Sequence, residues 1–260
     1  GRSDPDNKSG AFGNIFQMCF SDPNQGSASA DYIAAHGDLG SKIAIIYKND
    51  DNYSTGIRNT FVEEAAAKGL EVVYEGTFDD SNAQDFKVQL TQAQAEGAEI
   101  LFLPIYYDPA SLILTQANSM GFKPVFFGVD GMDGILTLEG FDTSLAEGVY
   151  LLTPFSADAA DDLTVNFVKN YKAKCNDEIP NQFAADAYDC IYAIKQACDN
   201  AGVTADMSAQ EISEKVIEQF KSMTFSGLTG SDMTWNENGE VTKLPKAVVI
   251  QNGVYVGVED

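Results

Sequence analysis

The chain has 260 residues, of which 44% are hydrophobic, and its 39 acidic and 16 basic side chains give a formal net charge of −23. That apolar content can form the core of one large or two modest domains. The excess of negative charge argues against nucleic acid or an anionic membrane surface as a partner. No apolar run approaches the length of a membrane span, and the polar start Gly1-Arg2-Ser3-Asp4 is unlike a signal peptide.

The first hundred residues show strands alternating with helices. Short apolar runs such as KIAIIY indicate buried strands, and apolar residues at helical spacing indicate the segments between them. In chain order, the expected elements are a strand over 15–20, a helix over 22–35, a strand over 42–47, a helix over 54–68 that ends at Gly69, a strand over 71–74 and a helix marked by Phe86, Leu90 and Ala93.

The segment 98–131 contains the clearest strand–helix–strand unit. Its first strand, 100–103, is apolar at every position, as in a parallel sheet that is covered on both faces. Asp108-Pro109 predicts a helix start with Asp108 as the N-cap, and the helix should end at Gly121. A second strand over 125–127 runs into Gly128-Val129-Asp130-Gly131. Polar residues thus follow both strands at their carboxyl ends, where open α/β sheets bind ligands.

The pattern changes after a further strand over 148–152. The alternation before it predicts a parallel sheet with right-handed crossovers. Three helices are expected between 160 and 225, and Asn252-Gly253 predicts a hairpin between 247–251 and 254–256. The three helices have no neighbouring strands in sequence, so either they pack on each other or the sheet that they belong to is missing.

Motifs for catalysis are absent from the sequence. His36 is the only histidine, and there is no Ser-His-Asp set, GxSxG, HExxH or calcium-loop pattern. The strand over 42–47 is followed by KNDDNY, which would repel a pyrophosphate, so no phosphate loop is present. The four cysteines have no metal-like spacing. We therefore expect no enzyme activity and no cofactor.

Polar and aromatic side chains follow several strands. Tyr53 follows the strand over 42–47, Tyr106 and Tyr107 follow 100–103, and Asp130 follows 125–127. Taken singly, each tyrosine could be a half-buried packing residue and Asp130 could stabilise a turn. As a set at one sheet edge, they offer a carboxylate, phenols and aromatic faces, which suit a ligand ammonium group. We favour binding for the set.

The sequence resembles the branched-chain amino acid-binding (leucine/isoleucine/valine-binding) substrate-binding proteins of ABC transporters, which have the type I periplasmic binding fold. The resemblance extends over nearly the whole chain. Its motifs, in order, are FSDPNQGSASADYI, KIAIIYKNDDNYSTGI, DFKVQLTQAQAEGAEILFLPIYYDPASLILTQANSMG, FFGVDGMD, EGVYLLTPFS, FVKNYKAKC, NQFAADAYDCIYAI and LTGSDMTWNENGE.

The resemblance implies an α/β fold of two lobes that close by a hinge over a small solute. Residues 22–152 and 246–260 would form the second, Rossmann-like parallel-sheet lobe. Residues 1–21 would be a crossover and first-lobe remnant, and 153–245 the helical part of the first lobe. Carried over by motif, Tyr53, Tyr106 and Asp130 would contact the ligand, with Asp130 holding an ammonium group. Phe183 would be a first-lobe contact, and Tyr107 a neighbouring one.

The chain departs from the family at its beginning, because family members usually start with several βα units of the first lobe. Those units supply the groups that hold the ligand carboxylate, so we expect a fragment that binds amino acids weakly or not at all. The implied function is an extracytoplasmic solute-binding protein that delivers an amino acid to the transmembrane subunits of an ABC permease. The alternative is the ligand-sensing domain of a receptor with the same fold, and a nucleotide-dependent enzyme ranks third.

Overall fold

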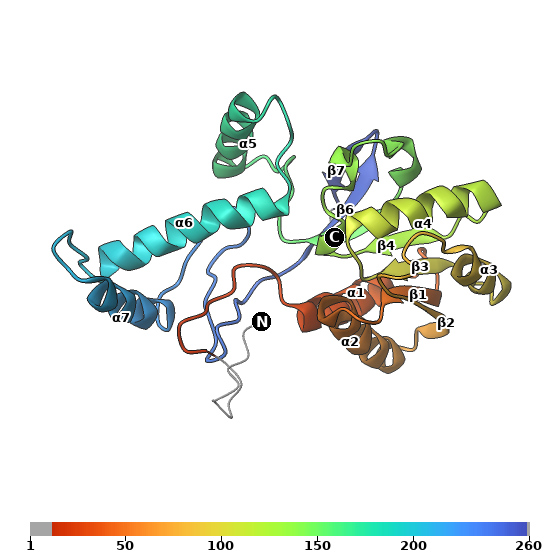
Figure 1. Cartoon of the computed structure of the whole chain (residues 1–260), viewed down its shortest axis with the longest axis horizontal. Helices are drawn as coiled ribbons and strands as arrows, with labels where there is room; N and C mark the ends of the chain where they lie inside the picture. Colours follow the sequence, from red (N-terminus) through yellow and green to blue (C-terminus); the bar gives the residue numbers. More distant parts are fainter. Residues whose placement is uncertain (1–11, 259–260) are drawn as a thin grey trace. The chain divides into compact units, whose positions relative to one another are not determined.

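The computed structural model describes residues 12–258 (Figure 1). Its internal contacts divide the chain into two compact units. Unit 1 comprises Gly1–Ser21 and Ala159–Leu244, and unit 2 comprises Asp22–Asp158 and Pro245–Asp260. Each unit is thus built from two separate stretches of the chain, and all seven strands of the described chain belong to unit 2.

Unit 2 is built on a seven-stranded sheet with the order β2-β1-β3-β4-β5-β6-β7. Neighbouring strands from β2 to β5 are parallel, whereas β6 pairs antiparallel with both β5 and β7. The sheet is therefore mostly parallel, with an antiparallel hairpin at one edge. The strands are β1 (Lys42–Lys48), β2 (Glu71–Phe78), β3 (Ile100–Leu103), β4 (Val125–Gly128), β5 (Tyr150–Thr153), β6 (Lys246–Gln251) and β7 (Val254–Gly257).

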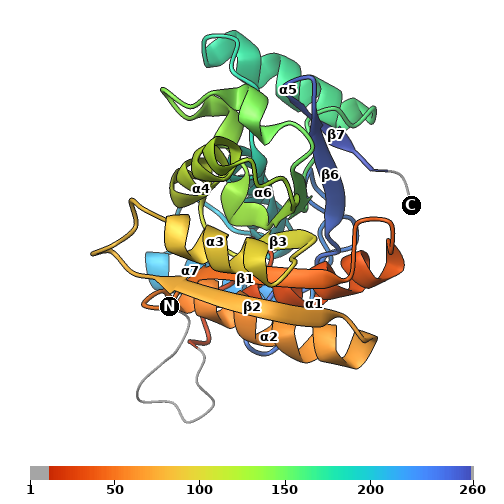
Figure 2. The ribbon, with the colours of Figure 1, turned by 90° about the vertical axis from the view of Figure 1, so that its right-hand side faces the viewer.

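Helices cover both faces of this sheet (Figure 2). Residues Ile43 and Ile45 of β1 pack toward α1 (Asp22–Ala35) and α2 (Asn52–Lys68), while the alternating residues Ala44 and Ile46 pack toward α3 (Lys87–Ala95) and α4 (Tyr107–Met120). All four residues of β3 are buried, because a central parallel strand has a helix layer on each side. The two-faced burial predicted for 100–103 is confirmed.

A glycine allows α1 and α2 to approach closely. A Cβ atom at Gly26 would lie 2.0 Å from Thr60 Oγ1 and 2.3 Å from the Ile57 carbonyl oxygen, so any larger residue would push the helices apart. The glycine therefore sets the depth at which α1 lies against α2, and with it the position of the neighbouring Gln25.

Short 3₁₀ turns connect β4 to β5. They are Asp130–Met132, Ile135–Thr137 and Thr143–Ala146. The first turn directly follows β4 and carries Asp130. The polar segment after β4 is thus a defined, folded-back turn with its own hydrogen bonds.

Two local predictions are wrong. No strand forms over 15–20: Gln17 N bonds to Gly239 O in a loop, whereas a strand needs a neighbouring strand along its length. Asp108 is not the N-cap of α4, because the helix begins at Tyr107 with Tyr106 as its cap. Pro109 is compatible with this earlier start, since the amides of the first turn have no intrahelical acceptor.

Unit 1 is mainly helical, as expected. Its helices are α5 (Asp162–Lys174), α6 (Gln182–Asn200) and α7 (Ala209–Phe220), and α7 starts with a capping box between Ser208 and Glu211. Together with two isolated β-bridges, α6 and α7 enclose a small core that includes Ala193, Phe220 and Trp235. Other apolar side chains of α6 stay exposed, among them Ile191 at 66%.

Within residues 12–258, no helix has the length and apolar character needed to cross a bilayer. The same part of the chain contains no group of three or more side chains suited to hold a metal ion.

Candidate functional site

The carboxyl end of β1 leads into α2 through a cap that fixes Tyr53. Asp51 is the N-cap, and its carboxylate accepts the backbone amide of Tyr53 at 3.0 Å. Ser54, fully buried in the same turn, accepts the amide of Lys48 at 2.8 Å and donates to the carbonyl of Pro104 at 2.6 Å. The first turn of α2 is thus tied both to its own strand and to the segment that follows β3.

Tyr106 stands at the carboxyl end of β3, as the N-cap of α4. Its ring stacks on the ring of Tyr53, with a centroid distance of 4.7 Å and an interplanar angle of 22°. The Tyr106 side chain is 44% exposed, so one of the two stacked rings remains accessible to solvent.

Asp130 lies at the carboxyl end of β4, and its carboxylate oxygen Oδ1 accepts the hydroxyl proton of Tyr53 at 2.5 Å. The same hydroxyl oxygen accepts the amide of Gly131 at 2.8 Å. A Cβ atom at Gly131 would lie 2.5 Å from the Tyr53 hydroxyl, so glycine is required for this approach. We call Tyr53, Tyr106 and Asp130 the tyrosine–aspartate cluster.

The hydroxyl of Tyr53 keeps its proton in this environment. Burial, and then the negative charge of Asp130, raise the pKa of Tyr53 well above its ordinary value. A protonated phenol can donate to the carboxylate, which is itself only 5% exposed. The single proton of Tyr53 is therefore engaged by Asp130, and a ligand would meet the carboxylate rather than this donor.

Two supporting residues of the site were not predicted from the sequence. The fully buried Gln25 of α1 accepts the amide of Asp130 through Oε1 at 3.2 Å. The hydroxyl of Tyr255, on β7, accepts the amide of Gly134 at 3.0 Å. Gln25 lies within a motif that carries the family resemblance, but no signal in the sequence pointed to Tyr255.

The cluster joins Tyr53, Tyr106 and Asp130 from three strand ends, as the parallel sheet predicted. Tyr107, the first residue of α4, instead packs against the core on the α3 and α4 face. Phe183 belongs to unit 1, where it lies in the first turn of α6 with 37% of its side chain exposed. The cluster within unit 2 includes neither of them.

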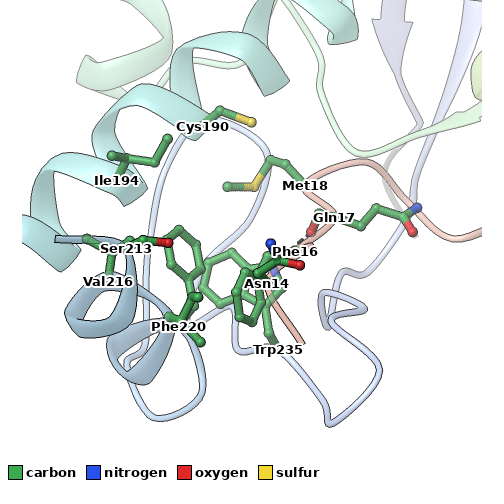
Figure 3. Close-up of a pocket in the computed structure, with 11 residues that line it drawn as sticks. Asn14, Phe16, Gln17, Met18, Cys190, Ile194, Ser213, Val216, Phe220 and Trp235 are labelled. Carbon is green, nitrogen blue, oxygen red and sulfur yellow. Dashed lines mark hydrogen bonds between the residues drawn. The ribbon is translucent and has the colours of Figure 1, made fainter. Parts of the chain in front are cut away.

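A separate apolar pocket lies in unit 1 between α6, α7 and the segment 14–18 (Figure 3). Its floor is aromatic: Phe220 lies 4.9 Å from Phe16 and 4.8 Å from Trp235, measured between ring centroids. The lining has no charged side chain and includes none of the predicted site residues. This pocket therefore cannot hold an ammonium group by charge.

The comparison with protein families matches residues 3–251 to the model described as "Periplasmic binding protein". The chain belongs to this family, which consists of binding proteins rather than enzymes. The resemblance and the fold class inferred from the sequence are thus confirmed: the chain has the α/β type I periplasmic binding fold, in part.

Among individual proteins, the chain is 31% identical over 167 residues to "Leu/Ile/Val-binding protein homolog 8" of Brucella abortus. The match covers 62% of this chain and 40% of that relative, so the chain spans less than half of its length. A leucine-binding protein of Thermotoga maritima is 25% identical, with a TM-score of 0.77 and coverage of 94% of this chain and 67% of that one. A branched-chain amino acid transporter substrate-binding protein of Streptococcus pneumoniae, in complex with isoleucine, has the same fold, at 24% identity and a TM-score of 0.79, with coverage of 95% of this chain and 68% of that one.

Proposed function

We propose that the chain is part of an extracytoplasmic solute-binding protein that captures an amino acid, branched-chain or similar in size, for an ABC permease. The observation that carries this proposal is the tyrosine–aspartate cluster at the carboxyl edge of the parallel sheet. Three consecutive parallel strand ends contribute to it, and this edge is where open α/β sheets bind ligands.

The chemistry of the cluster suits the amino end of the ligand. A carboxylate that is 5% exposed gains most from a partner of opposite charge, and an ammonium group can form charge-assisted hydrogen bonds with it. The accessible ring of Tyr106 adds an aromatic face for a cation or an aliphatic side chain. The names of relatives that bind leucine or isoleucine support an amino acid over other small solutes.

We propose further that unit 2 is the second lobe of the binding protein and that unit 1 belongs to the first lobe. In this assignment Phe183 is the first-lobe residue that contacts the ligand, and Tyr107 is a less central neighbour of the cluster. The groups that hold the ligand carboxylate are not among these residues, so they would come from another part of the first lobe.

The test is a thermal-shift screen of the full-length gene product against the amino acids and small carboxylic acids. A ligand that binds only the native state at one hundred times its Kd stabilises it by about 2.7 kcal/mol, which raises the Tm. We expect a shift with leucine, isoleucine, valine or another amino acid, and we expect Asp130→Ala to abolish it.

Asp108→Ala is the matched control, because it removes an exposed carboxylate from the nearby first turn of α4. This variant should keep the ligand-induced shift. A wild-type protein that responds to no amino acid would contradict the proposal and leave Asp130 as a structural residue of its turn.

A further inference from the structure

The loop that carries Asp130 is held along its whole length. Each of the five backbone amides from Asp130 to Gly134 donates a hydrogen bond, so no amide in this turn is left without an acceptor. Two of these bonds have acceptors on the same connection: Met132 N donates to Val129 O and Asp133 N to Asp130 O, at 2.9 Å each. The other three amides donate to side chains of other elements. The outside acceptors are Gln25 Oε1 for Asp130, the Tyr53 hydroxyl for Gly131 and the Tyr255 hydroxyl for Gly134.

Gln25 holds the beginning of the loop. Its side chain is fully buried, and its place is fixed because Gly26 lets α1 lie directly against α2. The acceptor oxygen meets the amide of Asp130 itself, so Gln25 fixes the backbone from which the carboxylate projects.

Tyr255 holds the end of the loop and repeats the arrangement found at Tyr53. The hydroxyl of Tyr255 accepts the amide of Gly134, which follows Asp133 in the chain. In the same way, the hydroxyl of Tyr53 accepts the amide of Gly131, which follows Asp130. The pKa of Tyr255 is raised by burial and then by the charge of Asp133. Tyr255 therefore stays protonated, and its hydroxyl holds the backbone at the end of the loop.

We infer that Gln25 and Tyr255 are positioning residues for Asp130, acting on the ligand-binding carboxylate through the two ends of its loop. This inference rests on the proposed function, in which Asp130 contacts the ligand. A binding constellation must be held within about 0.5 Å of its productive geometry by neighbours that are themselves fixed by packing. Gln25 and Tyr255 meet that requirement from α1 and from β7, two elements that are remote from the loop in sequence.

The experiment uses the full-length protein with Gln25→Met and Tyr255→Phe, which keep side-chain volume and remove the hydrogen-bonding oxygen. The first measurement is amide hydrogen exchange by NMR without ligand. We expect faster exchange at Asp130 in Gln25→Met and at Gly134 in Tyr255→Phe. The second is calorimetric titration with L-leucine and L-isoleucine well below the Tm, where we expect each variant to raise the Kd about three- to tenfold.

Matched controls remove the same groups elsewhere. Gln116→Met breaks an equivalent bond, in which the side-chain oxygen accepts the amide of Phe86 at 2.8 Å. Tyr74→Phe removes a hydroxyl beside the same core face that Tyr255 packs on, but from β2. Both controls should leave the Kd within about twofold of the wild type, even where they lower the Tm.

The outcomes separate the two proposals. Unchanged exchange at Asp130 and Gly134, or faster exchange with an unchanged Kd, overturns the positioning role and leaves the proposed function intact. In another outcome, the wild type binds neither amino acid while Gln25→Met and Tyr255→Phe still speed amide exchange at Asp130 and Gly134. That result would contradict the amino acid assignment and support the anchoring of the Asp130 loop by Gln25 and Tyr255.

Discussion

At the scale of single residues, Tyr53 and Tyr255 act as paired anchors of one loop. Each hydroxyl accepts a backbone amide of the loop, and the hydroxyl of Tyr53 also donates to the carboxylate of Asp130, so these phenols satisfy groups that would otherwise lose their hydration. Bonds of this kind are cooperative in a low-dielectric interior, and they specify one conformation of the loop.

This arrangement predicts that stability depends on pH at alkaline values. The pKa of Tyr53 and that of Tyr255 are raised above the ordinary value of 10.0 by burial and a nearby carboxylate. In the unfolded chain both phenols lose their protons at about pH 10, so the folded state then binds more protons and stability falls as the pH rises. Below that pH the two states bind the same number of these protons, and this contribution to the pH dependence vanishes.

The measurement is urea unfolding between about pH 9 and about pH 11, over which each phenol should lower the free energy of unfolding by about 1.4 kcal/mol in total. Tyr53→Phe and Tyr255→Phe should each reduce the decline over this pH range by about that amount. Tyr150→Phe, at a half-buried position of β5, controls for the loss of a hydroxyl. Slopes that match the wild type in both variants would show that these phenols are not shifted by folding.

At the scale of elements, a buried ion pair joins three segments of unit 1. Lys243 donates to the carbonyl of Met18 at 2.5 Å and to Asp186 of α6 at 2.6 Å, and the side chains of the pair are 0% and 5% exposed. Burial raises the pKa of Asp186, and the ammonium group of Lys243 offsets part of this effect. The neighbouring Asp189 accepts two backbone amides from the loop at Leu228 and Thr229.

Breaking this pair should cost more than removing it. Lys243→Met leaves Asp186 buried without its cation, and we expect the free energy of unfolding to fall by about 3–5 kcal/mol. The double variant Lys243→Met with Asp186→Leu should recover most of that loss, because neither charge then remains buried alone. Urea unfolding measures both, and a double variant as unstable as the single one would contradict this account.

The exposed pair of Lys195 and Asp199 on α6 offers the control. Its members are separated by one helical turn at the surface, where water screens their attraction. Lys195→Met should therefore change the unfolding curve little.

The elements that could be predicted from the sequence are those whose signals are local. The strand over 100–103 followed from an unbroken apolar run, and the hairpin from Asn252-Gly253, where Asn252 has a φ of 54° and Gly253 one of 73°. The prediction of a strand over 15–20 was wrong because strand formation depends on a pairing partner, which a local sequence pattern does not reveal. The start of α4 was misplaced because Asp108 and Pro109 fit several positions of a first helical turn.

The site could be predicted in part for the same reason. The parallel sheet order was enough to bring Tyr53, Tyr106 and Asp130 to one edge. The role of Gln25 was not predicted because its partner amide lies 105 residues away in the sequence. That of Tyr255 was not predicted because its hydroxyl bonds to an amide 121 residues away. Such contacts are set by packing depth and register, which a single sequence does not display.

At the scale of the whole molecule, the chain covers only part of its relatives, 40% of one Brucella protein and 67% of one Thermotoga structure. In the proposed function the cluster offers a carboxylate to the ammonium group of the ligand, whereas the ligand's own carboxylate needs donors from elsewhere. We therefore expect the 260-residue chain alone to bind leucine at least one hundredfold more weakly than the full-length protein. A hundredfold higher Kd corresponds to a loss of about 2.7 kcal/mol in binding free energy.

Calorimetric titration of both proteins with leucine measures this difference. The chain should first show cooperative unfolding in urea, so that weak binding is not confused with a lack of folding. Micromolar binding by the chain alone would contradict the expectation and show that the described residues suffice.

The division of unit 2 into two stretches also bears on the order in which the site is completed during synthesis. Strands β1 to β5 leave the ribosome first, whereas β6 and β7 follow only after residues 159–244 have been made. At typical synthesis rates of about 5–20 residues per second, the nascent chain spends several seconds with the open edge of β5 unpaired. Tyr255 arrives with the late hairpin, so the loop that carries Asp130 gains its second anchor only then. A nascent chain interrupted before β7 would present Asp130 on a loop held at one end alone.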